Sequence, residues 1–323
     1  MARHVLEPQR ATLHGQFSRD LTPALIINSG DTVCYRTIDV TWGIEQHGAP
    51  GTPRRRFEPR ELPRDDGPAL CGPVAIRGAM PGMTLEVRID VVEPVSWGWT
   101  YAGPSFFNAA LHTALGLAEE EKALIRWTLD AETMVGVSEH GHRLKLRPFL
   151  GTIGLSPKVP GLHSGWLPGR TGGNIDCKEL VAGSRLYLPI EVPDGLVSVG
   201  DGHAVQGDGE VGGSAIECPM ERVELRYVVR DDMRIGAPRA YTPVGWITFG
   251  FGERLDDAIA MALNEMLDLM QAQYALARPE ALALASVVVD VRITQLVNGV
   301  RGVHAVLPDG AIQEGPIIRN PVV

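Results

Sequence analysis

The sequence predicts a mainly β protein, a sandwich- or barrel-like unit with a pair of helices near its C-terminus. The chain of 323 residues contains 37 glycines and 24 prolines, which favour many turns and short strands over long helices. Short β-branched runs separated by turn residues fill the first hundred residues. Helical periodicity is clear only late in the chain, after most of the strands. This order of elements fits a β-sandwich or barrel with helical decoration.

The strands are predicted from β-branched runs and from alternation of apolar and polar residues. Residues 25–27 and 32–38 are β-branched, and the polar residues 28–31 form the turn between them. Residues 84–92 alternate over most of their length after a Pro-Gly turn, as expected for a half-buried strand. Further strands are predicted at 186–192, 196–199 and 220–230, and a short helix is expected at 106–117.

The clearest helix runs from Leu255 to Tyr274. Two aspartates near its start suit the positive end of the helix dipole. Pro279 fits the first turn of a second helix that runs towards Ser286. Spacings typical of one helical face place six apolar side chains in a single stripe, and we expect them to pack in the core: Ile259, Leu263, Met266, Leu267, Met270 and Tyr274.

Composition excludes several classes of protein. The net charge of −9 disfavours a nucleic-acid partner, because phosphate contacts need clustered basic residues. The single basic run, at 54–56, is followed by mixed charges and is predicted to be a solvated loop. No signal-like or membrane-spanning apolar segment is present, so a cytoplasmic protein without a membrane partner is expected. The four scattered cysteines fit this location.

The length suits one compact unit. Within this unit we consider a division into two lobes, residues 1–150 and 151–323. The second lobe would contain the acidic segment described next and the two C-terminal helices. We also expect a homo-oligomer.

Residues 172–217 contain most of the residues that can carry chemistry. Four of the eleven positions in 200–210 are glycine, which lets the backbone turn and lets a ligand approach closely. Carboxylates beside an imidazole are ligands of divalent metals, so the segment is a candidate metal site and, secondly, a hydrolytic site. The candidates among its acids, with its histidine, are Asp176, Glu179, Asp201, His203, Asp208, Glu210 and Glu217.

The spacing of these residues supports a shared site. If the strand at 196–199 stays extended past Gly200, Asp201 and His203 lie two apart and point to the same face. Asp208 and Glu210 repeat this spacing after a Gln-Gly break. The alternative is an acidic, solvated turn, since Asp and Gly are common in turns. A plain turn, however, needs neither a histidine nor a second acidic pair.

The same segment resembles the acetamidase/formamidase family of metal-dependent short-chain amidases. The similar runs keep their order over most of the chain. They are GPV at 72–74, GAMPG at 78–82, PFLGTIG at 148–154, RTGGNID at 170–176, GSRLYLP at 183–189, GDGHAVQGDGE at 200–210, AIE at 215–217, DVRITQLVN at 290–298 and GV at 302–303.

The resemblance implies a mostly β fold, a bound metal and hydrolysis of small amides such as formamide or acetamide. The chain departs from the family pattern at Met83, where the family usually has Asp, and at residues 69–71, where it often has His. Gly202 also stands where a larger residue is more usual. These departures bear on the substrate range more than on the reaction type.

A division of roles follows from the chemistry of amide hydrolysis, in which a divalent ion polarises the carbonyl and activates water while a carboxylate transfers protons. Glu210 is predicted to be the general base, with Asp208 as the second candidate. Gln206 and His163 are predicted to bind the substrate. Histidine favours Zn²⁺, and oxygen ligands alone would favour Ca²⁺. The predicted metal ligands are Asp176, Asp201, His203 and Glu217.

Other interpretations stay open. Cys177 is a rival nucleophile, although its neighbours in sequence point in different directions. His47 is a further candidate ligand, and His140 and His142 resemble a hairpin tip. Trp97 and Trp99 could wall a small pocket or pack in the core. The rival function is a non-catalytic, calcium-stabilised β-sandwich binding module, such as a carbohydrate-binding module.

Overall fold

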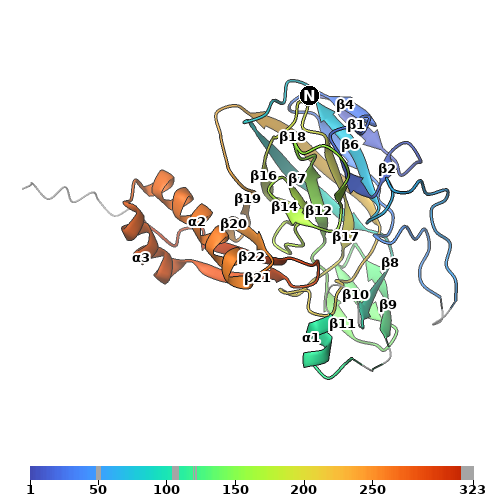
Figure 1. Ribbon diagram of the computed structural model, residues 1–323. Coiled ribbons are helices and arrows are strands. Elements are labelled where there is room, and N and C mark those ends of the chain that lie inside the picture. The colour runs from blue at the N-terminus through green and yellow to red at the C-terminus, as the bar shows by residue number, and fades with distance from the viewer. Residues whose placement is uncertain (49–51, 104–108, 119, 121, 314–323) are drawn as a thin grey trace, which may run out of the picture.

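The computed structural model describes residues 1–48, 52–103, 109–118, 120, 122–313. Within these ranges the chain is strand-rich, and Figure 1 shows a large body of sheets from which two parts project. One projecting part carries the strands of residues 97–145 with helix α1 (Ala109–Ala114), and the other carries helices α2 (Leu255–Tyr274) and α3 (Arg278–Val288). The predicted mainly β class with a late helical pair is confirmed.

The larger sheet of the described chain has nine strands. Its neighbours are antiparallel except for the parallel pair of β1 and β5. Across the sheet the order is β1 (Arg3–Leu6), β5 (Thr32–Tyr35), β18 (Met220–Arg230), β7 (Thr84–Pro94), β16 (Arg185–Pro189), β19 (Arg239–Thr242), β20 (Gly245–Gly252), β22 (Arg301–Pro308) and β21 (Asp290–Gln295).

The second sheet carries the segment of interest. Its order is β14 (Pro168–Gly169), β15 (Gly172–Asn174), β12 (Phe149–Leu155), β17 (Val197–His203), β6 (Leu70–Ile76) and β2 (Leu13–His14), with β4 (Leu25–Ile27) parallel to β6. Smaller groups are β11 (Arg143–Lys145), β10 (Val135–Ser138), β9 (Ala123–Asp130) and β8 (Trp97–Ala102), and the pair β13 (His163–Ser164) with β3 (Gln16–Phe17).

The two large sheets share one hydrophobic core. A single buried cluster joins Leu85 and Leu225 of the larger sheet to Val74, Ile153 and Val197 of the second. Strands β6, β12 and β17 are buried at every position, so this part of the second sheet is covered on both faces. Polar side chains at the end of β17 are therefore forced into the interior. The core also mixes residues from 1–150 and 151–323, and the proposed boundary between two lobes stays a prediction.

Most strands and both late helices lie where the sequence predicts them. Strands β7, β16 and β18 match the predicted segments, and the helix Leu255–Tyr274 has the predicted bounds. Strands β4 and β5 also form, but they belong to different sheets, so the turn between them carries the chain from one sheet to the other. Of the helix expected at 106–117, residues 106–108 lie outside the described residues, and α1 occupies 109–114.

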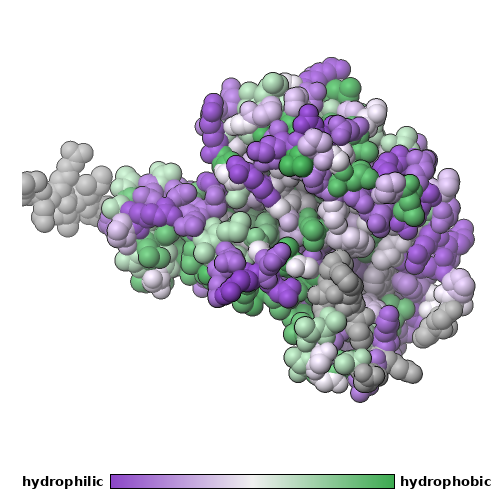
Figure 2. Space-filling model, viewed as in Figure 1, coloured by the Kyte–Doolittle hydropathy of each residue, from purple (hydrophilic) through white to green (hydrophobic). Residues whose placement is uncertain are grey.

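The apolar stripe of α2 packs as predicted, with Met266, Leu267 and Met270 buried and the rest of the stripe partly buried. The helix lies very close to β20, because a Cβ on Gly250 would stand 1.9 Å from the carbonyl oxygen of Ala258. Figure 2 shows hydrophobic surface on this projecting part, where Leu282 and Val287 are exposed. None of the helices in the described ranges has the length and hydropathy to cross a membrane.

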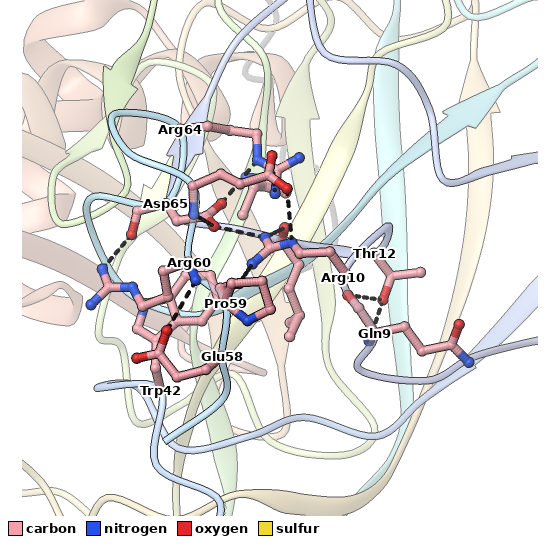
Figure 3. A network of polar contacts seen from close by, with 12 residues as sticks. Gln9, Arg10, Thr12, Trp42, Glu58, Pro59, Arg60, Arg64 and Asp65 are labelled. Carbon is pink, nitrogen blue, oxygen red and sulfur yellow. Dashed lines mark hydrogen bonds and ion pairs between the residues drawn. The ribbon is translucent and has the colours of Figure 1, made fainter. Parts of the chain in front are cut away.

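The loop at 52–66 is held to the body by ion pairs, seen in part in Figure 3. Buried Asp65 pairs with Arg10 at 2.8 Å and with Arg64 at 2.9 Å, while Arg60 lies over the ring of Trp42 at 4.8 Å. The prediction of a solvated loop is therefore wrong in part. Although Arg55 is exposed, the side chain of Arg54 is buried and pairs with buried Asp39, which compensates its charge.

Buried His14 ties strand β2 to β17. Its Nδ1 lies 2.8 Å from the carbonyl oxygen of Gln16 and its Nε2 lies 2.9 Å from Oγ of Ser198. A neutral ring satisfies both contacts, since Nδ1–H donates to the carbonyl and Nε2 accepts the hydroxyl proton. Burial lowers the pKa of His14 from 6.5 to about 4.

This pKa predicts a loss of stability in mild acid. In the unfolded chain His14 has its ordinary pKa of 6.5, whereas in the folded protein its pKa is about 4. The contribution of His14 to the free energy of unfolding is therefore complete above pH 6.5 and is lost as the pH falls from 6.5 to 4. The loss is about 3 kcal/mol at most. Urea unfolding at pH 7 and 4.5 should therefore show a smaller pH effect for His14→Gln than for the wild type. The exposed control His140→Gln should show the same change in the free energy of unfolding between the two pH values as the wild type. An equal change for His14→Gln and the wild type would contradict the assignment.

Candidate active site: a buried cluster of carboxylates around His203

Four carboxylates and one imidazole meet in the interior, although they come from separate segments. Asp201 and His203 end strand β17, and Asp176 follows β15. Glu210 lies in the loop after β17, and Glu217 lies just before β18. All five residues are buried, with exposed fractions between 1% and 7%. These residues therefore do not form the solvated turn that was the alternative to a shared site.

His203 is at the centre of the cluster. Its Nε2 lies 3.1 Å from Oδ1 of Asp201 and 3.2 Å from Oε2 of Glu217. Ligand atoms of Asp176, Asp201 and His203 lie within 4.8 Å of one another, and so do those of His203, Glu210 and Glu217. The geometry thus gives two overlapping groups that share the imidazole, and either could hold a cation.

Strand pairing explains the position of His203. It stands opposite Phe149 on one side and Glu217 on the other. Side chains of directly opposite residues lie on the same face of a sheet. Accordingly the ring of Phe149 packs edge-on against the imidazole, with centroids 5.0 Å apart, and the Glu217 carboxylate reaches its other side. Phenylalanine thereby shields the imidazole.

The strand stays paired as far as His203, and the predicted meeting of Asp201 with His203 is confirmed by their contact. The backbone is nevertheless irregular. Asp201 has φ of 59°, Asp176 of 54° and Glu210 of 46°, in the left-handed region that residues with a side chain seldom adopt. Such conformations cost free energy and collect at functional sites, where surrounding structure enforces them. Three of the four cluster carboxylates are held in this way.

Gly151 leaves the space that the cluster occupies. A Cβ at this position would stand 2.4 Å from Oδ2 of Asp201, 2.5 Å from Oδ1 of Asp176 and 3.0 Å from Cε1 of His203. No side chain fits there without moving these groups. The glycine of the PFLGTIG segment is therefore required by the close approach of three cluster residues.

Two amide side chains hold Asp176, and the sequence reasoning did not assign one of them. Asn298 donates from Nδ2 to Oδ2 of Asp176 at 2.5 Å, and Gln206 donates from Nε2 to its main-chain oxygen at 2.8 Å. Asn298 comes from the loop between β21 and β22, 122 residues further on. The only sequence signal for it is its place in the segment DVRITQLVN.

The electrostatics of the cluster are those of crowded acids in a dry interior. Burial and the neighbouring Asp201 hold the pKa of Asp176 well above its usual range, and burial and Asp176 do the same for Glu210. Burial raises the pKa of Glu217 to about 7 against the opposing effect of His203. Burial alone would lower the pKa of His203, but Glu217 and Asp201 hold it high. The four carboxylates therefore outnumber the single imidazole, and a cation would offset the remaining negative charge.

The orphaned atoms of the cluster show the same need. Among the described residues, Oδ1 of Asp176, Oε2 of Glu210 and Nδ1 of His203 are buried without a hydrogen-bond partner. Buried polar atoms usually find partners, and unmet ones often mark an ion or a ligand. Together with the cradle above Gly151, these atoms fit a divalent cation.

Two predicted site residues lie outside this cluster. Asp208 is exposed and pairs with Lys178 at 2.8 Å, so the structure does not bring it beside Glu210. His163 lies in β13, where its Nε2 contacts the carbonyl oxygen of Val159 at 2.8 Å. His163 lines a surface cavity together with Thr171 and Gly172, but no carboxylate of the cluster belongs to that lining.

The rival nucleophile is poorly placed for its chemistry. Cys177 is fully buried, and burial raises the pKa of its thiol to about 12. The thiolate is the nucleophilic form of cysteine, so this environment works against it. His140 and His142 lie near the turn between β10 and β11, with Nδ1 of His142 3.2 Å from Oγ of Ser138. His47 packs against Trp99 with ring centroids 5.2 Å apart.

Comparison with known proteins supports the resemblance. Residues 165–309, which include all five cluster residues, match the model of the Acetamidase/Formamidase family. A Schizosaccharomyces pombe protein that bears a formamidase name is 26% identical in an alignment of length 252 that covers 63% of this chain and 60% of that protein. The chain thus spans less than two thirds of that relative.

Solved structures agree over nearly the whole chain. A predicted acetamidase/formamidase of Thermoanaerobacter tengcongensis superposes with a TM-score of 0.82 at 25% identity, covering 96% of this chain and 97% of that one. An acetamidase of Bacillus halodurans gives a TM-score of 0.81 at 26% identity, covering 94% and 97%. The resemblance to the acetamidase/formamidase family is confirmed.

The glycine cradle makes a direct prediction. Gly151→Ala should push Asp201 and Asp176 apart and weaken binding of a divalent ion by roughly 10–100-fold, the usual effect of disturbing the support of metal ligands. Zinc content after dialysis against buffered Zn²⁺ measures this. Gly169→Ala is the control, because its Cβ would enter open space. Wild-type zinc affinity in Gly151→Ala would contradict the cradle.

Proposed function

We propose that this protein is a metal-dependent hydrolase of short aliphatic amides, such as formamide or acetamide, which it converts to the carboxylate and ammonia. The observation that carries the proposal is the buried group of four carboxylates around His203 inside the segment that matches the Acetamidase/Formamidase family. The names of the relatives support the amide bond as the target. The cytoplasmic location and the homo-oligomeric state expected from the sequence stay predictions.

Asp176, Asp201, His203 and Glu217 would hold the ion. Ligand atoms of Asp176, Asp201 and His203 lie within 4.8 Å of one another, and Oε2 of Glu217 lies 3.2 Å from Nε2 of His203. The buried negative charge of these acids needs a cation. When bound, a divalent ion polarises a carbonyl group and makes hydroxide available near neutral pH. The imidazole among the donors favours Zn²⁺ or another transition ion over Ca²⁺. The same imidazole is why we prefer an enzyme to a calcium-stabilised binding module.

Glu210 is the proposed proton carrier. Its Oε2 is buried and has no hydrogen-bond partner among the described residues, so it can accept a proton from the attacking water. Burial and Asp176 raise the pKa of Glu210, which helps the carboxyl group to keep that proton for the leaving nitrogen. One side chain thereby takes a proton from the attacking water and delivers it to the leaving amine, without contact with bulk solvent.

Gln206 is the proposed contact to the substrate amide. Its Nε2 is engaged with the main-chain oxygen of Asp176, which fixes the orientation of the side chain. Its Oε1 is buried and has no partner among the described residues. That oxygen can accept a hydrogen bond from the NH₂ group of a primary amide, a group that esters and carboxylates lack.

Removal of metal provides the first test of the function. Purified protein should release ammonia from formamide or acetamide, lose this activity after prolonged EDTA treatment, and recover it with Zn²⁺ or a similar divalent ion, because the buried acids need the cation to act. Ammonia release and elemental analysis are measured together. Full activity in a preparation shown to be free of metal would overturn the mechanism.

Paired mutants separate the ligand from the proton carrier. Glu210→Gln keeps the size of the side chain but cannot accept a proton, so kcat should fall roughly 10²–10⁴-fold while the metal content is unchanged. His203→Ala should lose metal and activity together. Asp208→Asn is the control and should keep most of the activity, since Asp208 is exposed and paired with Lys178.

The opposite pattern would reverse these roles. If Glu210→Gln loses metal while His203→Ala retains it, Glu210 is the ligand. If Glu210→Gln is nearly as active as the wild type while Asp208→Asn is slow, Asp208 is the proton carrier.

A further inference from the structure

Trp99 lies directly beside the carboxylate cluster. Its main-chain N–H donates to the carbonyl oxygen of Glu217 at 2.9 Å, and the N–H of Glu217 donates back at 2.8 Å. Two residues that exchange both bonds are direct neighbours across an antiparallel pair, about 5.5 Å apart at Cα, and their side chains share a face. Glu217 also stands opposite His203, in a pair whose flanking residues carry the hydrogen bonds: the N–H of Ala204 donates to the carbonyl oxygen of Ile216, and the N–H of Cys218 donates to that of Gly202. Trp99, Glu217, His203 and Phe149 therefore form one row, with the two polar residues between two aromatic rings.

The ring of Trp99 is fixed from behind. Its indole N–H donates to the carboxylate of Asp39, which is completely buried. Asp39 pairs in turn with Arg54 at 2.6 Å, and the guanidinium carbon of Arg54 lies 5.8 Å from the Trp99 ring centre. A buried ion pair that hydrogen-bonds to its neighbours restricts their arrangement, although Nε of Arg54 itself has no partner among the described residues. The buried arginine of the 54–56 run thus acts on the orientation of a ring next to Glu217.

His47 contacts both the Trp99 ring and a surface cavity. His47 packs edge-on against Trp99, and its Nε2 is buried without a hydrogen-bond partner among the described residues. His47 also lines a surface cavity of about 300 Å³ together with Gln46, Arg126 and Ser138. A chain of contacts therefore runs from the surface cavity through His47 and Trp99 to Glu217.

We propose that Trp99 is the wall that limits the length of the acyl group accepted at the site. This inference rests on the proposed amidase function. A short amide offers a polar head to the carboxylates and His203, and its acyl carbons need an apolar surface beside that head. Trp99 supplies such a surface next to Glu217, and its anchoring by Asp39 and Arg54 prevents it from giving way to a longer chain. A pocket with a rigid wall distinguishes substrates that differ by single methylene groups, by roughly 10–200-fold for each group.

The test is the chain-length profile of variants at Trp99. Trp99→Phe and Trp99→Leu should raise the ratio of kcat/KM for butyramide to that for formamide by on the order of 10-fold or more, because the space for acyl carbons grows. Trp127→Phe is the matched control. Trp127 is equally buried in the same group of strands, but it stands opposite Gly98, so its ring lies on the other face of these strands from Trp99. Trp127 also lines the cavity beside His47, but that cavity lies beyond the proposed wall, so the ratio should not move.

The outcomes separate the wall from a structural role and from a failed function. If the variants lose rate by one common factor for formamide, acetamide, propionamide and butyramide, Trp99 only supports the fold and the inference is overturned. The same holds if the ratio stays within twofold of the wild type. Wild-type protein that is loaded with zinc and hydrolyses none of these amides would overturn the proposed function itself, and the wall with it.

A measurement on the wild type keeps the inference testable if the variants do not fold. Formate, acetate, propionate and butyrate should inhibit formamide hydrolysis competitively, and the inhibition constant should rise at least tenfold between acetate and butyrate. Inhibition that is equal or stronger with the longer acids would show that no wall limits the acyl group.

Discussion

The burial of four carboxylates around one imidazole is the constraint on which this structure depends. Charged carboxylates repel one another and resist removal from water, so burial raises their pKa values. The interior tolerates such groups only where an opposite charge or hydrogen bonds offset the cost. His203 offsets part of the charge, and a divalent cation would offset the rest. The cluster is thus costly to the fold, and the proposed cation would compensate this cost.

The sandwich makes that burial possible. Strands β12, β17 and β6 are covered on both faces, so the polar residues at the end of β17 are buried. Gly151 leaves room where two carboxylates and the imidazole approach, and left-handed backbone at Asp201 turns its carboxylate towards His203. Asn298 reaches the cluster from the far C-terminal part of the chain. Distant segments therefore share the work of holding one site.

Polar support around the cluster extends to the N-terminal third. Asp39 and Arg54 form a buried ion pair that anchors Trp99, and Trp99 is the direct neighbour of Glu217 across the backbone pair. A buried pair of this kind stabilises little compared with apolar packing, but it specifies geometry. The pair lies beside the cluster, where it fixes the orientation of Trp99, the proposed wall for the acyl group of the substrate.

The sequence by itself determined features that depend on local spacing. The 3.6-residue stripe defined the helix Leu255–Tyr274, because backbone geometry alone sets this period, and the spacing of two predicted the contact of Asp201 with His203. The structure makes that contact through left-handed backbone at Asp201 and not through a fully extended strand. Tertiary structure decided what depends on burial and on contacts between distant segments. Asp208 and Glu210 have the same spacing, yet only Glu210 is buried, and Asn298 and buried Arg54 carry no local signal. Spacing cannot reveal such features, because the packing of other strands creates them.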